Sequence, residues 1–223
     1  MEQNELYPIF LKLHNLNVLI VGGGNVGLEK LSFLLKSSPN ANVEVVAKEF
    51  HLEIKVLAEN HPSIKLTKSK FKKKMLKKRH MVIACTDDLK VNKKVYDLAR
   101  KRYLICNIAD TPDLCDYYLG GIVTKGNVKI AISTNGKSPT TAKRLREFFE
   151  EVIPEDINQM VENLNEYRKT LKGNFQEKSC RGRVAMRENK TSWGGLSNDA
   201  TDGKIGWGAS DKGLIHNVAR STP

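Results

Sequence analysis

A glycine-rich turn between an apolar run and an amphipathic stretch constrains this chain most. Residues 17–21 (NVLIV) form a short apolar run, and Leu31, Leu34 and Leu35 then recur with helical spacing. Residues 22–27, between the two, read Gly-Gly-Gly-Asn-Val-Gly and satisfy the pattern G-x-G-x-x-G. A strand, a tight turn and a helix in this order predict a dinucleotide-binding turn, with the helix N-terminus facing a pyrophosphate.

Each glycine of the pattern has a separate role. Gly22 permits the sharp turn, Gly24 lets phosphates approach the backbone, and Gly27 lets the helix pack on the strand. The alternative is a glycine-rich loop that binds no ligand. We expect NAD to be the cofactor, with contacts from Gly22, Gly23, Gly24, Asn25, Val26 and Gly27.

The residue that contacts the adenosine ribose is expected about 20 positions further on, at the end of the second strand. Lys48 and Glu49 occupy that place. Glu49 is suited to the 2′-hydroxyl of NAD, whereas Lys48 is suited to the 2′-phosphate of NADP, and we prefer NAD. An ordinary exposed acid at the start of a helix is an equally good interpretation of Glu49.

Strands and helices alternate through the first half of the chain. Further strands are predicted at residues 42–47, 63–69, 81–85 and 104–109, and further helices at 50–59 and 91–102. This alternation predicts an α/β fold with a doubly wound parallel sheet of the Rossmann type. We assign residues 1–113 to this NAD-binding domain.

The pattern changes after residue 113. Residues 121–125 and 127–133 predict an antiparallel hairpin, and Ser138-Pro139 predicts the start of a helix that ends near Val152. A last helix is expected from Pro154 to about Lys172. Residues 114–178 are therefore expected to form a small hairpin-plus-helices unit, and the polar, glycine-rich residues 179–223 are expected to be a disordered tail.

Composition excludes several classes of protein. No run approaches the roughly 20 apolar residues that span a bilayer, and residues 1–10 lack the features of a signal peptide, so we expect a cytoplasmic protein without a membrane partner. The cysteines form no CxxC pair and are interpreted as reduced thiols. The histidines are scattered, so no resident metal is expected.

A net charge of +12 and nine basic residues between Lys65 and Arg79 raise a rival hypothesis. The chain would then be a non-catalytic NAD-sensing or nucleic-acid-binding Rossmann module. Phe71 is the one aromatic residue in this run, and no nucleic-acid-binding motif is present, so we expect no nucleic acid partner. The run is otherwise a solvated face, or a surface that steers an acidic small molecule towards the protein.

Five motifs occur in an order typical of one family. They are YPIFL at residues 7–11, VGGGNV at 21–26, ACTDD at 84–88, CNIAD at 106–110 and STNGKSP at 133–139. Over residues 6–175 the chain resembles the precorrin-2 dehydrogenase/sirohydrochlorin ferrochelatase module of siroheme synthase. The resemblance implies NAD-dependent oxidation of precorrin-2 to sirohydrochlorin, in some members followed by insertion of ferrous iron as a substrate. It also implies a homodimer, with residues 114–178 as the dimerisation and substrate unit.

The resemblance also implies site residues. Asp110 falls on the aspartate implicated in both reactions, and Thr86, Asp87 and Asp88 fall on the segment that approaches the nucleotide. Thr134 stands where the family's hairpin motif can carry a second serine. The candidate substrate contacts are Asn107, Thr134, Lys137 and Arg144, with Lys143 and Arg146 as alternative partners for carboxylates.

Chemistry supports the same place for Asp110. It ends a predicted parallel strand, where open α/β sheets bind ligands, and a carboxylate there can act as a general base. The alternative is a turn aspartate before Thr111-Pro112. Asp113 and Asp116 follow at intervals of three, so a helical turn would bring three carboxylates together and attract iron. Solvated acids around a loop are the other interpretation of these two residues.

Overall fold

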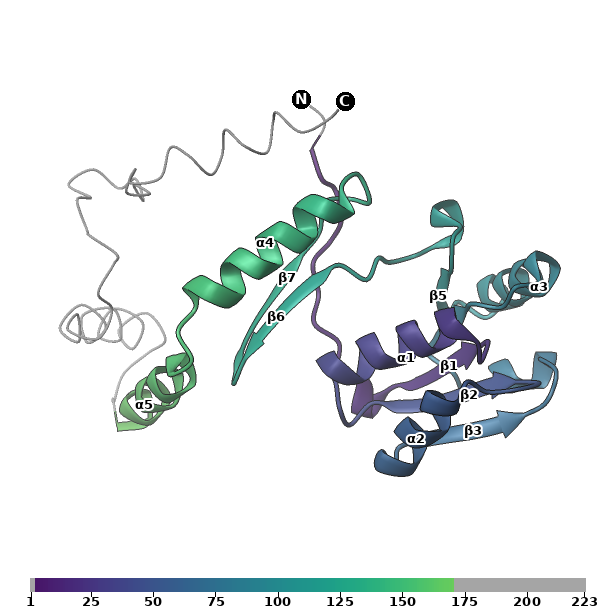
Figure 1. Cartoon of the computed structure of the whole chain (residues 1–223), viewed down its shortest axis with the longest axis horizontal. Coiled ribbons are helices and arrows are strands. Elements are labelled where there is room, and N and C mark those ends of the chain that lie inside the picture. Colours follow the sequence, from purple (N-terminus) through teal and green to yellow (C-terminus); the bar gives the residue numbers. More distant parts are fainter. Residues whose placement is uncertain (1–2, 171–223) are drawn as a thin grey trace. The chain divides into compact units, whose positions relative to one another are not determined.

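A five-stranded parallel sheet forms the centre of the first part of the chain (Figure 1). The computed structural model describes residues 3–170. Its parallel strands are β1 (Asn17–Val21), β2 (Asn42–Ala47), β3 (Ile64–Lys68), β4 (Met81–Ala84) and β5 (Ile105–Ile108). Their order in the sheet is β3-β2-β1-β4-β5, with parallel pairing throughout. The predicted Rossmann-type α/β sheet is therefore confirmed.

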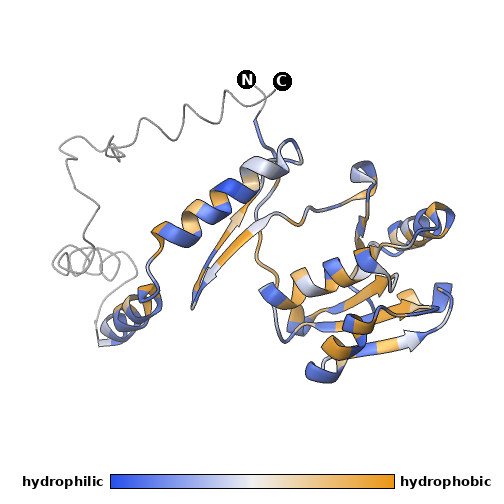
Figure 2. Cartoon of the chain, viewed as in Figure 1, coloured by the Kyte–Doolittle hydropathy of each residue, from blue (hydrophilic) through white to orange (hydrophobic). Residues whose placement is uncertain are grey.

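Helices cover both faces of this sheet. On one face, α1 (Asn25–Ser37) and α2 (Leu52–Asn60) bury Leu31 and Ile54 against Val18 of β1. On the other face, α3 (Leu89–Arg100) buries Val95 against Leu19. Figure 2 shows the corresponding concentration of hydrophobic residues along the strands. Because β1 is buried on both faces, its sequence is continuously apolar rather than alternating.

Caps decide where two of the helices begin. α3 begins two residues before the predicted start, because Oδ1 of Asp88 accepts hydrogen bonds from the N–H groups of Lys90 (2.9 Å) and Val91 (3.2 Å). α2 begins two residues after the predicted start, because Nδ1 of His51 accepts from the N–H of Glu53 at 3.3 Å. Both differences come from local hydrogen bonds that hydrophobic periodicity does not reveal.

The lysine-rich segment between β3 and β4 is anchored to the core. It contains the short 3-10 helix η2 (Lys73–Leu76), in which Leu76 is 1% exposed, while Phe71 and Met75 pack against the same core. Every lysine of this segment is exposed. Arg79 instead forms an ion pair with the largely buried Glu44. Apolar anchors thus hold a surface of solvated lysines in place.

A hairpin and two helices follow the parallel sheet. The hairpin consists of β6 (Gly121–Lys125) and β7 (Val128–Ile132), and α4 (Pro139–Val152) contacts both of its strands. The predicted start of α4 is confirmed, because Oγ of Ser138 accepts a hydrogen bond from the N–H of Thr141 at 3.2 Å. The last described helix is α5 (Ile157–Thr170).

The 3-10 helices η1 (Leu13–Asn15) and η3 (Pro112–Leu114), like η2, are not predicted by the sequence pattern.

The first compact unit of the chain ends at Asn158 and includes the parallel sheet, the hairpin and α4. A domain boundary after residue 113 stays a prediction, and residues 179–223 lie outside the described part of the chain. None of the described helices is both long and apolar enough to cross a bilayer.

Replacing Leu76 by alanine should destabilise the protein although it lies in a lysine-rich, loop-like segment. Leu76 is almost fully buried, so Leu76→Ala should lower the free energy of unfolding by about 2–5 kcal/mol. The neighbouring exposed Lys77 gives a matched control, since Lys77→Ala should change it by no more than about 0.5 kcal/mol. Urea denaturation followed by circular dichroism measures both. Equal stability of the two variants would contradict the anchoring role of Leu76.

Candidate functional site

The turn between β1 and α1 excludes side chains at three of its glycines, Gly22, Gly23 and Gly27. Gly22 has a φ of +131°, and a Cβ built there would lie 2.5 Å from the carbonyl oxygen of Cys85. A Cβ at Gly27 would lie 2.4 Å from the carbonyl oxygen of Gly22. Gly22 therefore packs directly against the carboxyl end of β4, and Gly27 packs against Gly22, so both positions need glycine.

Gly24 has a different environment. It is the N-cap residue of α1, and no described atom lies within 4 Å of a Cβ built on it. In the described part of the chain, no side chain caps α1, so the first N–H groups of the helix are left for another acceptor. An open approach to an uncapped helix N-terminus fits a pyrophosphate. The glycine turn therefore fits the phosphates of a dinucleotide.

The end of β2 lies against the same turn. The N–H of His51 donates to the carbonyl oxygen of Gly23 at 2.7 Å, and a Cβ at Gly23 would lie 2.4 Å from the carbonyl oxygen of Glu49. Lys48 and Glu49 are both exposed. They occupy the position expected for the ribose contact, and their role in binding stays a prediction.

Two residues of the segment after β4 have structural roles that their sequence position does not indicate. Asp88 uses its carboxylate to cap α3. Thr86 bonds through its hydroxyl and its backbone to the buried side chain of Asn92, with distances of 2.7 Å between Oγ1 and Oδ1 and 2.9 Å between the Thr86 carbonyl oxygen and Nδ2. Asp87 is exposed and remains the candidate here for a contact with the nucleotide. Sequence reasoning missed Asn92, which fixes this loop.

Asp110 lies just beyond the carboxyl end of β5, as predicted. It is exposed and has a φ of +58°, in the left-handed region that aspartate tolerates better than most residues. The N–H of Thr111 donates to the carbonyl oxygen of Ile108 at 3.2 Å and closes the turn. This backbone conformation supports the turn interpretation of Asp110 and leaves its carboxylate at the sheet edge.

The three aspartates after β5 do not form one cluster. Oδ1 of Asp116 accepts from Arg100 at 2.7 Å, and its Oδ2 accepts from the backbone N–H of Cys106 at 2.9 Å. Asp116 therefore holds the loop to β5 and α3 instead of joining Asp110. Within residues 3–170, no group of three or more His, Cys, Asp or Glu residues is placed to hold a metal ion.

A cavity of about 620 Å³ lies beside Asp110. One wall is α1, which contributes Lys30, Phe33 and Lys36, three residues that share a face of the helix. The opposite wall includes α4, which contributes Lys143 and Arg146. The remaining lining comes from the segment after β5 and from the hairpin. The cavity therefore combines apolar surface, several cations and two carboxylates, the exposed Asp110 and Glu150, which pairs with Arg146.

One hydrogen bond ties the hairpin to α1 at Ser37, a residue that lines this cavity. Nζ of Lys129 on β7 donates to the carbonyl oxygen of Ser37 at 2.5 Å, at the C-terminal end of α1. A lysine is well suited to this position, because the last carbonyl groups of a helix lack partners within the helix. The sequence offers no signal for this contact between residues 92 positions apart.

Some of the predicted substrate contacts line the cavity and others do not. Asn107 lines the cavity, but its amide also donates to the carbonyl oxygen of Tyr117 at 2.9 Å. Thr134 lines the cavity too, with its hydroxyl within 3.1–3.3 Å of the backbone of Ser138. Lys137 is not among the lining residues.

Arg144 lies away from this cavity, and its predicted contact with substrate stays a prediction. It does not line the cavity and instead borders a separate depression with Thr140 and Glu147. Arg146 is the arginine of α4 that faces the cavity, and it also pairs with Glu150 at 2.5 Å. Successive helical residues differ by about 100° in direction, so two positions along the helix are enough to change its face.

The buried cysteines are not activated nucleophiles. Burial raises the pKa of the Cys85 thiol to about 12, and burial together with the carboxylate of Asp116 raises the pKa of Cys106 to about 12. Burial also raises the pKa of Cys115, the one cysteine that lines the cavity. Because the thiolate is the reactive form, these residues act as packing groups at neutral pH.

Two family models match the chain. The first, described as putative NAD(P)-binding, matches residues 9–121, and the second, described as sirohaem biosynthesis protein central, matches residues 125–151. The first match contains the glycine turn, and the second contains the hairpin strand β7 and most of α4.

Similar curated proteins are siroheme synthases. That of Zymomonas mobilis is 29% identical over 219 residues, which cover 97% of this chain and 44% of that protein. That of Pseudoalteromonas translucida is 33% identical over 220 residues, which cover 97% of this chain and 44% of that protein. The chain spans less than half the length of these curated relatives.

A solved structure of SirC, precorrin-2 dehydrogenase, has a similar fold. Its TM-score is 0.65 at 24% sequence identity, and the match covers 84% of this chain and 92% of that one. At this level of identity the likeness shows a shared fold.

Alanine substitutions at Gly24 and Gly22 should have different effects, one on NAD affinity and the other on the stability of the fold. Gly24→Ala adds a Cβ where a pyrophosphate would approach, so NAD should bind about tenfold more weakly, equivalent to about 1.4 kcal/mol, with nearly unchanged stability. Gly22→Ala should instead destabilise the fold by about 3 kcal/mol through strain and overlap with Cys85. Calorimetric titration and thermal unfolding measure the two effects. Unchanged NAD affinity of folded Gly24→Ala would contradict this placement of the phosphates.

Proposed function

The chain belongs to the siroheme synthase family of NAD(P)-binding proteins, and from this premise we propose that it oxidises precorrin-2 to sirohydrochlorin with NAD as the hydride acceptor. The observation that carries the proposal is the cavity that has Asp110 in its lining at the carboxyl edge of a dinucleotide-binding sheet. The reduced cysteines, free at positions 85, 106 and 115, suit a cytoplasmic enzyme.

The lining of the cavity suits a tetrapyrrole with carboxylate substituents. Phe33, Pro139 and Ile132 provide apolar surface for a flat macrocycle. Lys30, Lys36, Lys143 and Arg146 provide positive charge for its acetate and propionate groups. Arg146 already pairs with Glu150, so a substrate carboxylate would compete with that glutamate for its guanidinium.

We assign the proton transfer to Asp110. Oxidation of precorrin-2 transfers a hydride to the nicotinamide ring of NAD and releases a proton. The exposed carboxylate of Asp110 faces this cavity and can accept that proton as a general base. The chain's contribution is then to hold the macrocycle beside the cofactor and to provide one base.

We extend the proposal to insertion of ferrous iron into sirohydrochlorin. Metal insertion displaces two pyrrole N–H protons, and Asp110 is the exposed carboxylate beside the cavity that can receive them. Iron would enter as a substrate of this reaction and not as a resident metal.

We further propose that the active protein is a homodimer. Leu145, Phe148 and Val152 form a stripe along α4 and are 39%, 40% and 53% exposed. The hairpin has two strands, and such a sheet is marginally stable unless another surface packs against it. A second copy that covers the α4 stripe would supply the missing apolar contact.

Asp110→Asn should retain NAD binding and lose most dehydrogenase turnover, by about a hundredfold or more. Asparagine tolerates the left-handed φ of this position, so the fold should persist. Asp113→Asn is the control, because Asp113 is exposed but does not line the cavity. The assay is anaerobic conversion of enzymatically generated precorrin-2, with NADH and the visible spectrum followed together. An unaltered rate for Asp110→Asn would remove this residue from the mechanism.

The same assay on the natural protein tests the function itself. Sirohydrochlorin formed in step with NADH supports the dehydrogenase, and a later spectral change on addition of ferrous iron supports the chelatase. Folded protein that binds NAD but leaves precorrin-2 unchanged would overturn the proposal. A non-catalytic NAD-sensing or nucleic-acid-binding module would then be the better interpretation.

Phe148→Glu combined with Leu145→Glu should convert the dimer into a monomer, because two charges in an apolar interface are costly to bury. Glu151→Gln on the same helix provides a control at an exposed polar position. Light scattering coupled to size-exclusion chromatography measures the mass. A monomeric natural protein at micromolar concentration would refute the dimer.

A further inference from the structure

Two turns lie next to one another at the amino-terminal edge of the parallel sheet. The N–H of Ile105, at the start of β5, donates to the carbonyl oxygen of His80, which precedes β4, at 3.1 Å. Lys78 stands two positions before His80, and Tyr103 stands two positions before Ile105. The side-chain amide of Asn17 on β1 also donates to the carbonyl oxygen of Lys78 at 3.0 Å. The turn at Lys78 and the turn at Tyr103 are therefore both anchored to the same edge of the sheet.

Lys78 and Tyr103 have a backbone conformation that is unusual for residues with side chains. Their φ angles are +58° and +56°, in the left-handed region. The N–H of Tyr103 donates to the carbonyl oxygen of Arg100 at 3.1 Å, at the end of α3. The N–H of Leu104 donates to the carbonyl oxygen of Ala99 at 3.2 Å. These two bonds form a Schellman motif, in which the left-handed residue is usually glycine, so tyrosine is the less stable choice at this position.

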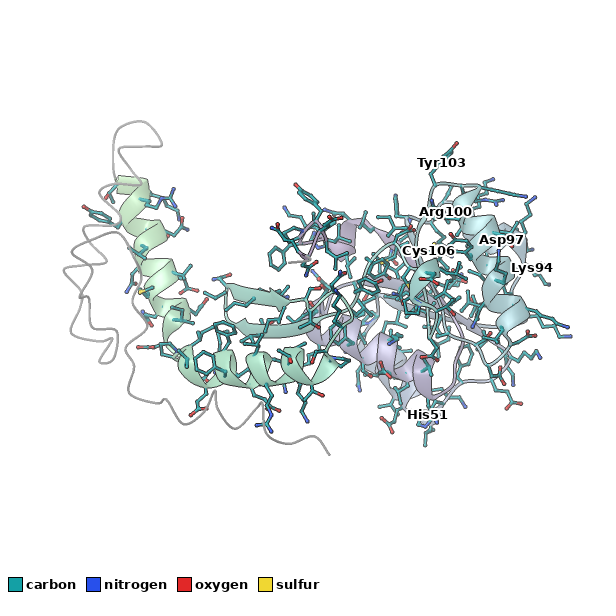
Figure 3. All side chains as sticks on the ribbon, turned by 90° about the horizontal axis from the view of Figure 1, so that it is seen from above. His51, Lys94, Asp97, Arg100, Tyr103 and Cys106 are labelled. Atoms are coloured by element: carbon teal, nitrogen blue, oxygen red, sulfur yellow. The ribbon has the colours of Figure 1, made fainter. Side chains whose placement is uncertain are left out.

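Burial does not offset the strain at Tyr103. Its side chain is 97% exposed and projects from the end of α3 (Figure 3). In the same view it lies well apart from His51, which follows the carboxyl end of β2. A strained and fully exposed aromatic residue, at a position where glycine would be more stable, points to a role in binding.

The residues around the two turns are cationic. Lys77, Lys78 and Lys101 are exposed, and within residues 3–170 none of them forms an ion pair. Residues 60–86 and residues 98–109 include no aspartate or glutamate. The two segments that build this edge therefore carry positive charge without a carboxylate of their own.

The amino-edge surface consists of four exposed residues, Lys77, Lys78, Lys101 and Tyr103. The strands of the sheet are all parallel, so the glycine turn and Asp110, which follow carboxyl ends, lie at the opposite edge. A strand rises about 3.3 Å per residue, so β4 alone separates the two edges by roughly 10 Å. These lysines are therefore not placed at the cavity, and attraction of an acidic substrate does not explain them.

Exposed lysines beside an exposed aromatic ring suit a single-stranded nucleic acid. Ammonium groups neutralise backbone phosphates, and an unpaired base stacks on tyrosine. An acidic protein fits less well, because protein interfaces are depleted in lysine. The lysine-rich run by itself gives no reason to expect nucleic acid, since its one aromatic residue, Phe71, packs against the core. The fold supplies an exposed ring from a different segment, the turn after α3.

We propose that the amino-edge surface binds single-stranded nucleic acid, as an activity separate from the dehydrogenase. Tyr103 stacks on one base, and Lys77, Lys78 and Lys101 contact neighbouring phosphates. The strain at Tyr103 is retained because its ring is used in binding. Since this surface lies at the opposite edge of the sheet from the glycine turn, NAD and nucleic acid bind at the same time.

Fluorescence anisotropy of the natural full chain with a labelled single-stranded RNA of about 12 nucleotides tests the proposal. Tyr103→Gly should weaken binding by about tenfold, because a stacked base is lost. The same variant should raise the melting temperature by about 2–4 °C, because glycine relieves the left-handed strain. Tyr103→Phe keeps the ring and should bind like the natural protein. A purely structural role of Tyr103 would not produce a variant that is more stable and binds less tightly.

A pair of lysine substitutions tests the cations. Lys78→Ala combined with Lys101→Ala should reduce the slope of log affinity against log salt by about 1.4, which is about 0.7 for each lost phosphate contact. Lys55→Ala combined with Lys90→Ala is the matched control, because both lysines are exposed but lie on α2 and at the start of α3. The control should leave the slope nearly unchanged. Single-stranded DNA of the same length shows whether the surface distinguishes RNA from DNA.

Three results would overturn the proposal. The first is RNA affinity that Tyr103→Gly and the pair Lys78→Ala with Lys101→Ala leave unchanged. The second is displacement of the RNA by saturating NAD, which would assign binding to the glycine turn. The third is absence of binding to single-stranded RNA and DNA, whether or not an acidic peptide or vesicles of anionic phospholipid bind instead. None of these measurements uses precorrin-2, so the dehydrogenase proposal is tested separately.

Discussion

The close contact between the β1–α1 turn and the end of β4 is the constraint on which the site depends. Gly22 approaches the carbonyl group of Cys85 so closely that no side chain fits between them. This contact starts α1 at the edge of the sheet, with its N-terminus open beside Gly24. The same helix then directs Lys30 and Lys36 into the cavity. One helix therefore joins the turn proposed to hold the phosphates to the cavity proposed to hold the substrate.

Polar residues at this edge divide into those that hold loops and those that remain for chemistry. Asn92 and Asp116 are held in hydrogen bonds that fix the segments after β4 and β5. Asp88 caps α3. Asp110 differs, since it is exposed and lines the cavity. The neighbouring segments fix the backbone that carries Asp110, which suits the general base proposed for this position.

The hairpin and α4 contribute more to the cavity than to the core. Val123 and Ile132 are the buried residues of the hairpin, and α4 has no buried side chain. Their position relative to the parallel sheet relies on polar contacts such as that of Lys129 with Ser37. An apolar stripe on α4 remains exposed in the single chain. The hairpin and α4 have few buried residues of their own, so they gain stability mainly from the surfaces that pack against them.

Hydrophobic periodicity and the glycine pattern were sufficient to predict the five parallel strands, their helices and the turn at Gly22–Gly27, because these are local signals. They also placed Asp110 at the edge of the sheet. They could not choose between Arg144 and Arg146, because that choice depends on which face of α4 turns towards the cavity. Nor could they reveal that Asn92 fixes the Thr86 loop or that Lys129 reaches Ser37. Contacts between separate segments exist only once the chain has folded, so tertiary structure alone decided them.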